Sequence, residues 1–348
     1  MRKFAYRLAS LIVMSYALSA CQPEPLEVVV RLVPMQQISS PPGDYIDVAW
    51  LVDDQLVVTY DPAPRARNPG SDLWIMRADG SDLRRMALPQ DDRYACLVTF
   101  FHSPVRLPDG RLAFERECST KQGAHVNIVA WNPQTETSEL LYEYELPRGA
   151  VSFTFAPDMS RGIMAPNTGI ADELYLLDTE TYSTLDLGLA RANKPAWSPD
   201  GQSIVFFGNR QMPGQPGPHW ANQPRDLWLV PANCVTSQGG CASDLRLLIS
   251  NIRAPSAGKW SPDGHWLVFD GDLHDHGLGI WLMNVDTGVV FQVAAGDYRW
   301  PEWSPDGQHL VVLGPPEALR KGEVPHYRPA LYIVDVSEVV SESVTSAP

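Results

Sequence analysis

The chain has 348 residues and a formal net charge of −14, because 41 Asp and Glu outnumber 27 Lys and Arg. This acidic balance disfavours nucleic-acid binding and adhesion to anionic lipid headgroups, since both need basic surfaces. Nucleic acid is therefore not an expected partner.

The first element is an export signal. Three basic residues precede the apolar run Ala9 to Leu18, which is too short for a membrane span, because a spanning helix needs about 20 residues. The segment Leu18-Ser19-Ala20-Cys21 resembles the bacterial lipobox. The resemblance implies a signal peptide at 1–20, lipidation of Cys21 and a linker at 21–25. The alternative is an ordinary secretory signal in which Cys21 is incidental. The expected location is extracytoplasmic, with the lipid in the cell membrane or outer membrane.

Internal repetition dominates residues 26–340. Identical Trp-Ser-Pro-Asp-Gly motifs begin at Trp197, Trp260 and Trp303, and degenerate copies occupy 50–53, 107–110 and 155–158. Pro presets the first turn position, Asp suits the second, and Gly accepts the left-handed conformation. Each motif therefore predicts a tight turn between two strands.

A second set of apolar segments follows these motifs, and several of them end in turn residues such as Asp286-Thr287-Gly288. Each unit is thus predicted to hold four antiparallel strands, A to D. The turn Asp positions lie 42 to 63 residues apart, near the roughly 40 to 50 residues of a propeller blade. The sequence predicts an all-β, six-bladed β-propeller over 26–340. We expect the N-terminal stretch Leu26 to Pro34 to complete the last blade, and residues 341–348 to form a flexible tail.

The repeated Trp-Ser-Pro-Asp-Gly followed by a strand resembles the WD-like β-propeller repeat of the TolB family, as does Ala78-Asp79-Gly80-Ser81-Asp82-Leu83. The resemblance covers about residues 26–340 and implies the fold. It does not imply an activity, because one fold hosts many functions. Prolyl oligopeptidase-like enzymes carry similar propellers, but their Gly-x-Ser-x-Gly nucleophile turn is absent from this sequence.

The B–C and D–A loops of a propeller share one face, and here the B–C loops are long and varied. Loops on a rigid scaffold favour binding residues. The candidate ligand face comprises His102, His125, His219, Trp220 and His326. The alternative is that loops simply hold polar residues, and that Trp220 covers the core of its own loop.

The sharpest local pattern is Asp270, Asp272, His274 and His276. These side chains would share one side of an extended segment, and carboxylate with imidazole suits a divalent metal. A solvated acidic loop is the competing interpretation, and no cofactor is expected.

The channel mouth offers a second test. The positions three residues before each motif Trp, or its equivalent, are Asp47, Ser103, Ser152, Lys194, Ala257 and Trp300. They do not make a ring of metal ligands, which weakens an enzyme interpretation. The motif tryptophans themselves are expected to pack between blades.

Four cysteines remain beside Cys21. An even number suits two disulfides in an exported protein. Cys96 and Cys118 are expected on one face of one blade, and Cys234 and Cys241 flank a C–D turn.

Taken together, these features predict a lipid-anchored, non-catalytic module that binds or scaffolds a protein, a peptide or an envelope glycan. Two alternatives stay open: a metal-dependent lyase or hydrolase acting on carbohydrate, and a sensory or assembly subunit of an envelope complex.

Overall fold

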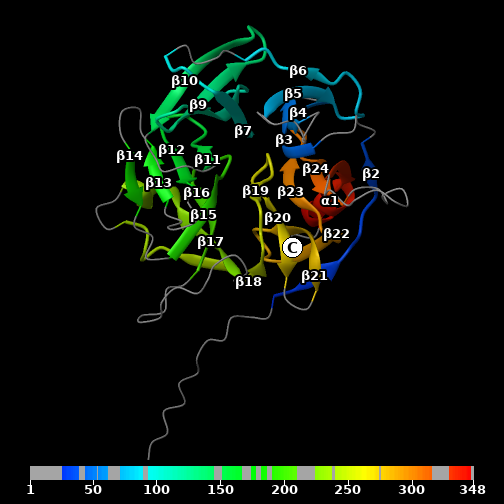
Figure 1. Ribbon diagram of the computed structural model, residues 1–348. Coiled ribbons are helices and arrows are strands. Elements are labelled where there is room, and N and C mark those ends of the chain that lie inside the picture. Colours follow the sequence, from blue (N-terminus) through cyan, green and yellow to red (C-terminus); the bar gives the residue numbers. More distant parts are fainter. Residues whose placement is uncertain are drawn as a thin grey trace, which may run out of the picture.

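The sheets of the computed structural model are arranged around a common centre (Figure 1). The structure describes residues 26–38, 44–52, 54–61, 71–88, 93–144, 151–166, 174–177, 182–185, 190–209, 224–236, 240–273, 276–315 and 329–345. The predicted signal peptide at 1–20, the predicted lipidation site Cys21 and the predicted linker at 21–25 lie outside these residues.

Three four-stranded antiparallel sheets come first along the chain. The first holds β3 (Asp44–Val52), β4 (Gln55–Asp61), β5 (Asp72–Arg77) and β6 (Arg84–Arg85). The second holds β7 (Val98–Arg106), β8 (Leu112–Ser119), β9 (Ala124–Asn132) and β10 (Thr137–Tyr144). The third holds β11 (Val151–Phe155), β12 (Gly162–Pro166), β13 (Leu174–Leu177) and β14 (Tyr182–Leu185).

A nine-stranded sheet follows. Its first four strands are β15 (Ala190–Trp197), β16 (Ser203–Asn209), β17 (Arg225–Pro231) and β18 (Arg246–Arg253). The next four are β19 (Gly258–Trp260), β20 (Trp266–Leu273), β21 (Gly277–Asn284) and β22 (Val290–Ala295). The two groups join only through two residue pairs between β18 and β20. A short 3-10 helix, Ala232–Thr236, follows β17.

The last sheet combines both ends of the described chain. It holds β23 (Arg299–Trp303), β24 (His309–Gly314), β25 (Ala330–Asp335) and β2 (Met35–Gln37), with β2 antiparallel to β25. The segment that the sequence predicted for this place, Leu26 to Pro34, instead contains β1 (Val28–Val30), which lies parallel to β22 at the edge of the nine-stranded sheet. The N-terminal stretch therefore contacts two neighbouring sheets.

The C-terminal end also differs from the sequence-based expectation. Where a flexible tail was expected from 341, helix α1 (Ser337–Thr345) continues from β25. The side chain of Asp335 accepts hydrogen bonds from the Ser337 N–H and hydroxyl, which satisfies a donor at the helix start. Val336 and Val339 are buried in the apolar cluster under the helix. Packing on this core supports a helix that would be marginal in isolation.

The first strand of each repeat faces the centre in Figure 1. Contacts between these inner strands run around the axis in a closed circle: β3 with β7, β7 with β11, β11 with β15, β15 with β19, β19 with β23, and β23 with β3. Apolar clusters fill the spaces between neighbouring sheets. The architecture is all-β and propeller-like.

The repeated motif forms the tight turn that its residues predict. In the copy at 197–201, the Ser198 hydroxyl donates to Asp200 Oδ1 at 2.6 Å and accepts from Ser203 N at 2.9 Å. Gly201 has a φ of 72°, which other residues rarely adopt. A Cβ placed on Gly201 would lie 3.3 Å from Cδ of Pro157 in the preceding unit. The motif turns therefore pack against one another around the ring.

The motif tryptophans also connect neighbouring units. Trp50, Trp197 and Trp303 are buried. Trp260 Nε1 donates to the Ala196 carbonyl at 3.1 Å and Trp303 Nε1 donates to the Lys259 carbonyl at 3.3 Å, each across to the preceding unit. This arrangement agrees with their predicted role between blades.

Candidate functional site

A cavity of about 60 Å³ lies on the axis of the ring. It is lined by every residue of the register that the sequence placed at the channel mouth: Asp47, Ser103, Ser152, Lys194, Ala257 and Trp300. Val48, Ser256, Lys259 and Glu302 are among the other lining residues. We call this space the axial cavity. One residue position, repeated in each unit, thus builds a single site from strands far apart in the chain.

The inner strands bulge where they reach this cavity. Register shifts occur beside Ser103, Lys194 and Trp300, and these three residues have left-handed φ values of 50°, 52° and 55°. Such a conformation costs a non-glycine residue of order 1–3 kcal/mol, and it persists only where surrounding contacts hold it. Three residues at equivalent positions of different repeats thus carry this strain around one cavity, which marks this region as a candidate functional site.

Hydrogen bonds to the preceding unit hold the strained residues. Ser103 N donates to Asp47 Oδ2 at 3.1 Å, Lys194 N donates to Ser152 Oγ at 3.3 Å, and Trp300 N donates to Ser256 Oγ at 3.1 Å. The acceptor in each bond belongs to the inner strand, or its immediate flank, of the neighbouring repeat. These bonds fix the backbone of the cavity wall and so set the direction of its side chains.

Lys194 and Trp300 meet across the cavity. The Lys194 ammonium lies 4.3 Å from the centre of the Trp300 ring, within the range of a cation–π contact. Burial lowers the pKa of Lys194 from 10.5 to about 8, although Asp47 and Asp270 act in the opposite direction. Burial destabilises the charged form of Lys194, so an anion in contact with the ammonium would stabilise that form.

An ion pair lies beside Lys194. Lys259 Nζ and Glu302 Oε1 are 2.9 Å apart and belong to neighbouring inner strands. Burial raises the pKa of Glu302, and the adjacent Lys259 ammonium opposes that rise. Both side chains also line a second, wider hollow, so the pair borders two connected parts of the axis.

The second hollow has a volume of about 480 Å³ and opens among the motif turns. We call it the turn-face mouth. Its wall contains prolines of five motifs, Pro108, Pro157, Pro199, Pro262 and Pro305, with Trp50, Trp197, Trp260 and Trp303. It shares Val105, Phe153 and Pro195 with the axial cavity. The axis therefore has a narrow part that contains charged side chains and a wider part whose wall combines apolar and polar groups.

The predicted metal ligands are divided by the fold. Asp270 and Asp272 lie within strand β20, which continues past the loop start expected from the sequence. Asp270 is fully buried and accepts hydrogen bonds from Ser256 N at 2.8 Å, from Ala257 N at 2.9 Å and from the Ser256 hydroxyl. Asp272 Oδ2 lies 4.0 Å from Nη1 of Arg253. Asp270 thus supports the wall of the axial cavity.

The two histidines of that pattern lie beyond the end of β20. The ring of His276 packs edge-on against Trp281, with centroids 6.1 Å apart. His274 lies outside the described residues. Among the part of the chain that the structure describes, no three His, Cys, Asp or Glu side chains are grouped as metal ligands.

Two members of the predicted ligand face also lie in strands. His102 is in β7 next to the strained Ser103, and its ring stacks on Phe100 with centroids 5.8 Å apart. Burial lowers the pKa of His102, whereas Asp47 and Glu117 act to raise it. His125 lies in β9 and pairs with Cys118 in β8. His219, Trp220 and His326 lie outside the described residues.

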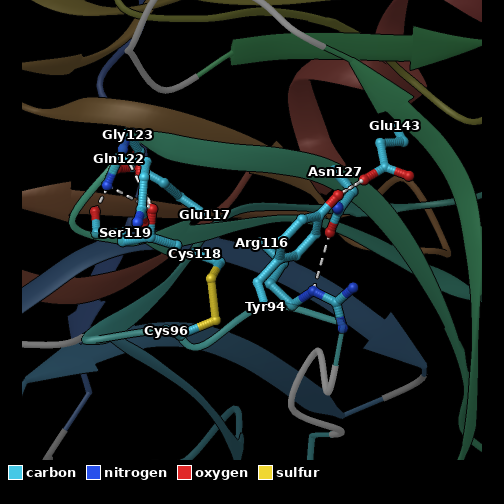
Figure 2. Close-up of a disulfide and its surroundings, with 11 residues drawn as sticks. Tyr94, Cys96, Arg116, Glu117, Cys118, Ser119, Gln122, Gly123, Asn127 and Glu143 are labelled. Atoms are coloured by element: carbon cyan, nitrogen blue, oxygen red, sulfur yellow. Dashed lines mark hydrogen bonds between the residues drawn. A yellow bond between two sulfur atoms is a disulfide. The ribbon is translucent and has the colours of Figure 1, made fainter.

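The disulfide Cys96–Cys118 anchors the segment that enters β7 (Figure 2). Tyr94 in this segment stacks on His125 with centroids 3.7 Å apart, and its hydroxyl donates to Glu143 Oε1 at 2.7 Å. Arg93 pairs with Glu143 Oε2 at 2.7 Å. Residues 93–97 therefore extend from the start of β7, the first strand of the second sheet, to β10, its last strand, and contact β10 through Glu143.

The second disulfide joins Cys234 to Cys241. Cys234 lies in the short helix after β17, and both cysteines are buried in the apolar cluster there. Both pairings predicted from the sequence are present in the structure.

Lys194, Lys259 and Glu302 were not predicted as functional residues. Its spacing from Trp197 placed Lys194 at the channel mouth, but residues of this composition predict no ring of metal ligands, and so none of them was marked as functional. The signal that could have marked it is chemical: one lysine and one tryptophan interrupt a register of otherwise small or acidic residues.

Comparisons with known proteins agree with the architecture. The structure resembles TolB from Acinetobacter baumannii, with 16% sequence identity and a TM-score of 0.54 over 85% of this chain and 76% of that chain. It also resembles an oligogalacturonate lyase in complex with manganese, with 14% identity and a TM-score of 0.51 over 90% and 98% of the two chains. Regucalcin from Agrobacterium tumefaciens, a calcium-binding protein, gives 13% identity and a TM-score of 0.50 over 89% and 96%.

These likenesses define a TolB-like β-propeller fold. No family model matches the sequence, and no curated protein matches it either. No helix among the described residues has the length and apolar character to cross a bilayer.

Proposed function

We propose that this chain is an extracytoplasmic, lipid-anchored β-propeller that works as a non-catalytic binding module through its axial cavity. The observation that carries the proposal is the set of three left-handed, non-glycine residues, Ser103, Lys194 and Trp300, that surround this cavity. Strain of this kind is maintained at binding and active sites, where it presents side chains to a ligand. The ligand class is a protein, a peptide or an envelope glycan.

The proposal includes a six-bladed ring closed by the N-terminal strand. Two observations support it: the closed circle of contacts among six inner strands, and the weak junction of two residue pairs that divides the nine-stranded sheet. Pairing of β2 with β25 then supplies the outer strand of the last blade. Such closure removes an exposed sheet edge, which would otherwise favour aggregation.

Membrane attachment through Cys21 rests on the signal-like residues 1–20 and the lipobox-like segment. Growth with a labelled fatty acid tests it. We expect the label on the wild-type protein and none on Cys21→Ser. A labelled Cys21→Ser variant would refute the lipid anchor and leave the propeller as a secreted or otherwise attached module.

The binding proposal is tested by filling the axial cavity. The variant Ser152→Phe adds a ring at the cavity wall, and Thr137→Phe adds the same ring to the exposed edge strand β10. Purified domains with unchanged circular dichroism are cross-linked in envelope extracts. We expect Ser152→Phe to lose a partner that wild type and Thr137→Phe both retain. Equal capture by all three proteins would place binding elsewhere and refute the proposal.

We further propose that the module works without a metal. The support is that the Asp270 carboxylate already accepts three hydrogen bonds from Ser256 and Ala257. Metal-dependent catalysis is the competing function, and elemental analysis of the dialysed domain decides between them. Near-stoichiometric metal that is lost in His274→Ala/His276→Ala would overturn the metal-free proposal.

A further inference from the structure

The axial cavity contains a cation that lacks a matching anion. In the described part of the chain, no carboxylate lies within 4 Å of Lys194 Nζ, which lies 4.3 Å from the centre of the Trp300 ring, although Asp47 and Asp270 also act on it electrostatically. Trp300 attracts the ammonium through its π face but accepts no strong hydrogen bond. The donor capacity of the ammonium is therefore directed at the cavity.

Charged groups on the surrounding elements have other partners. Glu302 of β23 is paired with Lys259, which lies in β19. Asp47 of β3 accepts the Ser103 N–H, and Asp270 of β20 accepts from Ser256 and Ala257 with Arg299 at 3.9 Å. Arg225 of β17 adds positive charge near Lys194. A further anion is the group that would complete this arrangement.

Two hydroxyl groups of the wall add donors. Ser152 Oγ accepts the Lys194 N–H, which leaves its own hydrogen to donate. Ser103 also lines the cavity and carries a second hydroxyl. One ammonium and two hydroxyls match the two oxygens of a carboxylate, which accept about four hydrogen bonds. The cavity of about 60 Å³ has room for roughly four to six water-sized groups at 10–15 Å³ each, enough for a carboxylate with one or two carbons.

We propose that the axial cavity is a carboxylate-binding site in which the Lys194 ammonium, placed by Trp300, pairs with the carboxylate and Ser103 and Ser152 donate to it. This inference rests on the proposed binding function and names the ligand chemistry. The source is either a small organic acid or the carboxylate end of a peptide that continues into the turn-face mouth. The motif prolines and tryptophans in the wall of that mouth suit the apolar parts of such a ligand.

Binding at this site is linked to protonation. The pKa of Lys194 is lowered to about 8, and a bound carboxylate raises it, because the charged form gains a partner. Complex formation therefore takes up protons near and above pH 8, and almost none at pH 6. The apparent affinity falls about tenfold per pH unit above 8 until the pKa of the complex is reached.

Titration calorimetry with defined probes tests the proposal. The probes are sodium acetate and the dipeptide acetyl-glycyl-alanine with either a free or an amidated C-terminus. The variants are Lys194→Met, which keeps an unbranched side chain without charge, and Lys121→Met, which changes an exposed lysine. Runs at pH 6 and pH 8 in buffers of different ionisation enthalpy measure the protons taken up.

We expect the carboxylate probes to bind wild type and Lys121→Met alike, with proton uptake at pH 8 only. Loss of a charged hydrogen bond should weaken their binding to Lys194→Met by about 10-fold or more, and the amidated dipeptide should lose as much on wild type. Acetate binding as tight as the dipeptide identifies a small acid as the source, and a much tighter dipeptide identifies a chain end. Equal binding of the free and amidated dipeptides, or pH-independent binding without proton uptake, would overturn the proposal.

Stability gives a second readout that does not need a ligand. A lysine pKa lowered on folding means that the unfolded state binds more protons between pH 8 and 10.5, so its effect on stability becomes more favourable as pH rises through that window. Lys194→Met removes the free-energy cost of burying a charged ammonium, and we expect the melting temperature of this variant at pH 7 to rise above that of wild type. A lower melting temperature would assign Lys194 a structural role and contradict the inference.

The two proposals can fail separately. If Ser152→Phe loses the captured partner while Lys194→Met and amidation change nothing, the binding module stands and the carboxylate site is wrong. If Ser152→Phe retains the partner and no carboxylate probe binds, both are wrong.

Discussion

Removal of the Cys96–Cys118 disulfide tests how the second sheet is held. The bridge closes a loop with a sequence separation of 22, and the Cys234–Cys241 bridge closes one of 7. The chain-entropy relation then assigns about 3.4 kcal/mol to the first and about 2.4 kcal/mol to the second at 25 °C. We therefore expect Cys96→Ala/Cys118→Ala to lose about 1 kcal/mol more unfolding free energy than Cys234→Ala/Cys241→Ala.

Alanine is the appropriate replacement, because Cys118, Cys234 and Cys241 are buried and a serine hydroxyl would add an unpaired polar group. Urea unfolding of the oxidised domain, followed by tryptophan fluorescence, measures the loss. The comparison is valid where the dependence on urea is equal for the two variants. The Tyr94 and Arg93 contacts to Glu143 remain in the first variant, so residues 93–97 should stay packed against β10 at low urea. An equal or larger loss in the second variant would refute the loop-entropy reasoning.

Three further outcomes are expected. In urea unfolding, Gly271→Ala should lose at least about 2 kcal/mol more unfolding free energy than Gly277→Ala. Both glycines have a positive φ, but only at Gly271 would a Cβ lie 2.8 Å from Ile252 and 2.9 Å from the Arg253 carbonyl. Similar losses in the two variants would contradict crowding at Gly271. Trp303→Phe should lose about 1 kcal/mol more unfolding free energy than Trp197→Phe in the same assay. Trp303 Nε1 donates to the Lys259 carbonyl, whereas Trp197 Nε1 has no acceptor among the described residues. The reverse order would show that the hydrogen bond between units adds no stability. The Ser198 hydroxyl and the Gln202 N–H lower the pKa of Asp200 below 3.8. The contribution of the Asp200 carboxylate to stability is therefore present above pH 3.8 and is lost as pH falls through the lowered pKa. The stability difference between wild type and Asp200→Asn should shrink from pH 5 to pH 3, and a constant difference would show no such linkage.

The repeat and its turns could be predicted from the sequence because their determinants are local. In the motif copies that contain Pro-Asp-Gly, these residues restrict the backbone of the turn within five residues, and apolar segments on either side define strands. The cysteine pairs followed from their places in this repeat. Even the register of the axial cavity could be counted from the motif tryptophans, since equivalent positions in each unit reach the same distance from the axis.

The tertiary structure decided what those positions do together. Which segment pairs with β25 depends on competition between β1 and β2 for two neighbouring sheet edges, and no local pattern ranks them. Helix α1 depends on burial of Val339, which only the folded core provides. Likewise, Asp270 supports the cavity wall because Ser256 and Ala257 are brought to it by the hairpin.

Lys194 shows most clearly which properties cannot be predicted from the sequence. Its sequence neighbours predict a strand residue, whereas its lowered pKa and its contact with Trp300 arise from side chains contributed by other repeats. Burial and electrostatic interactions are sums over all nearby groups, and chain order does not specify those groups. The sequence by itself determined the repeating scaffold, and only the closed ring placed one amine, one indole and two hydroxyls around the same small space.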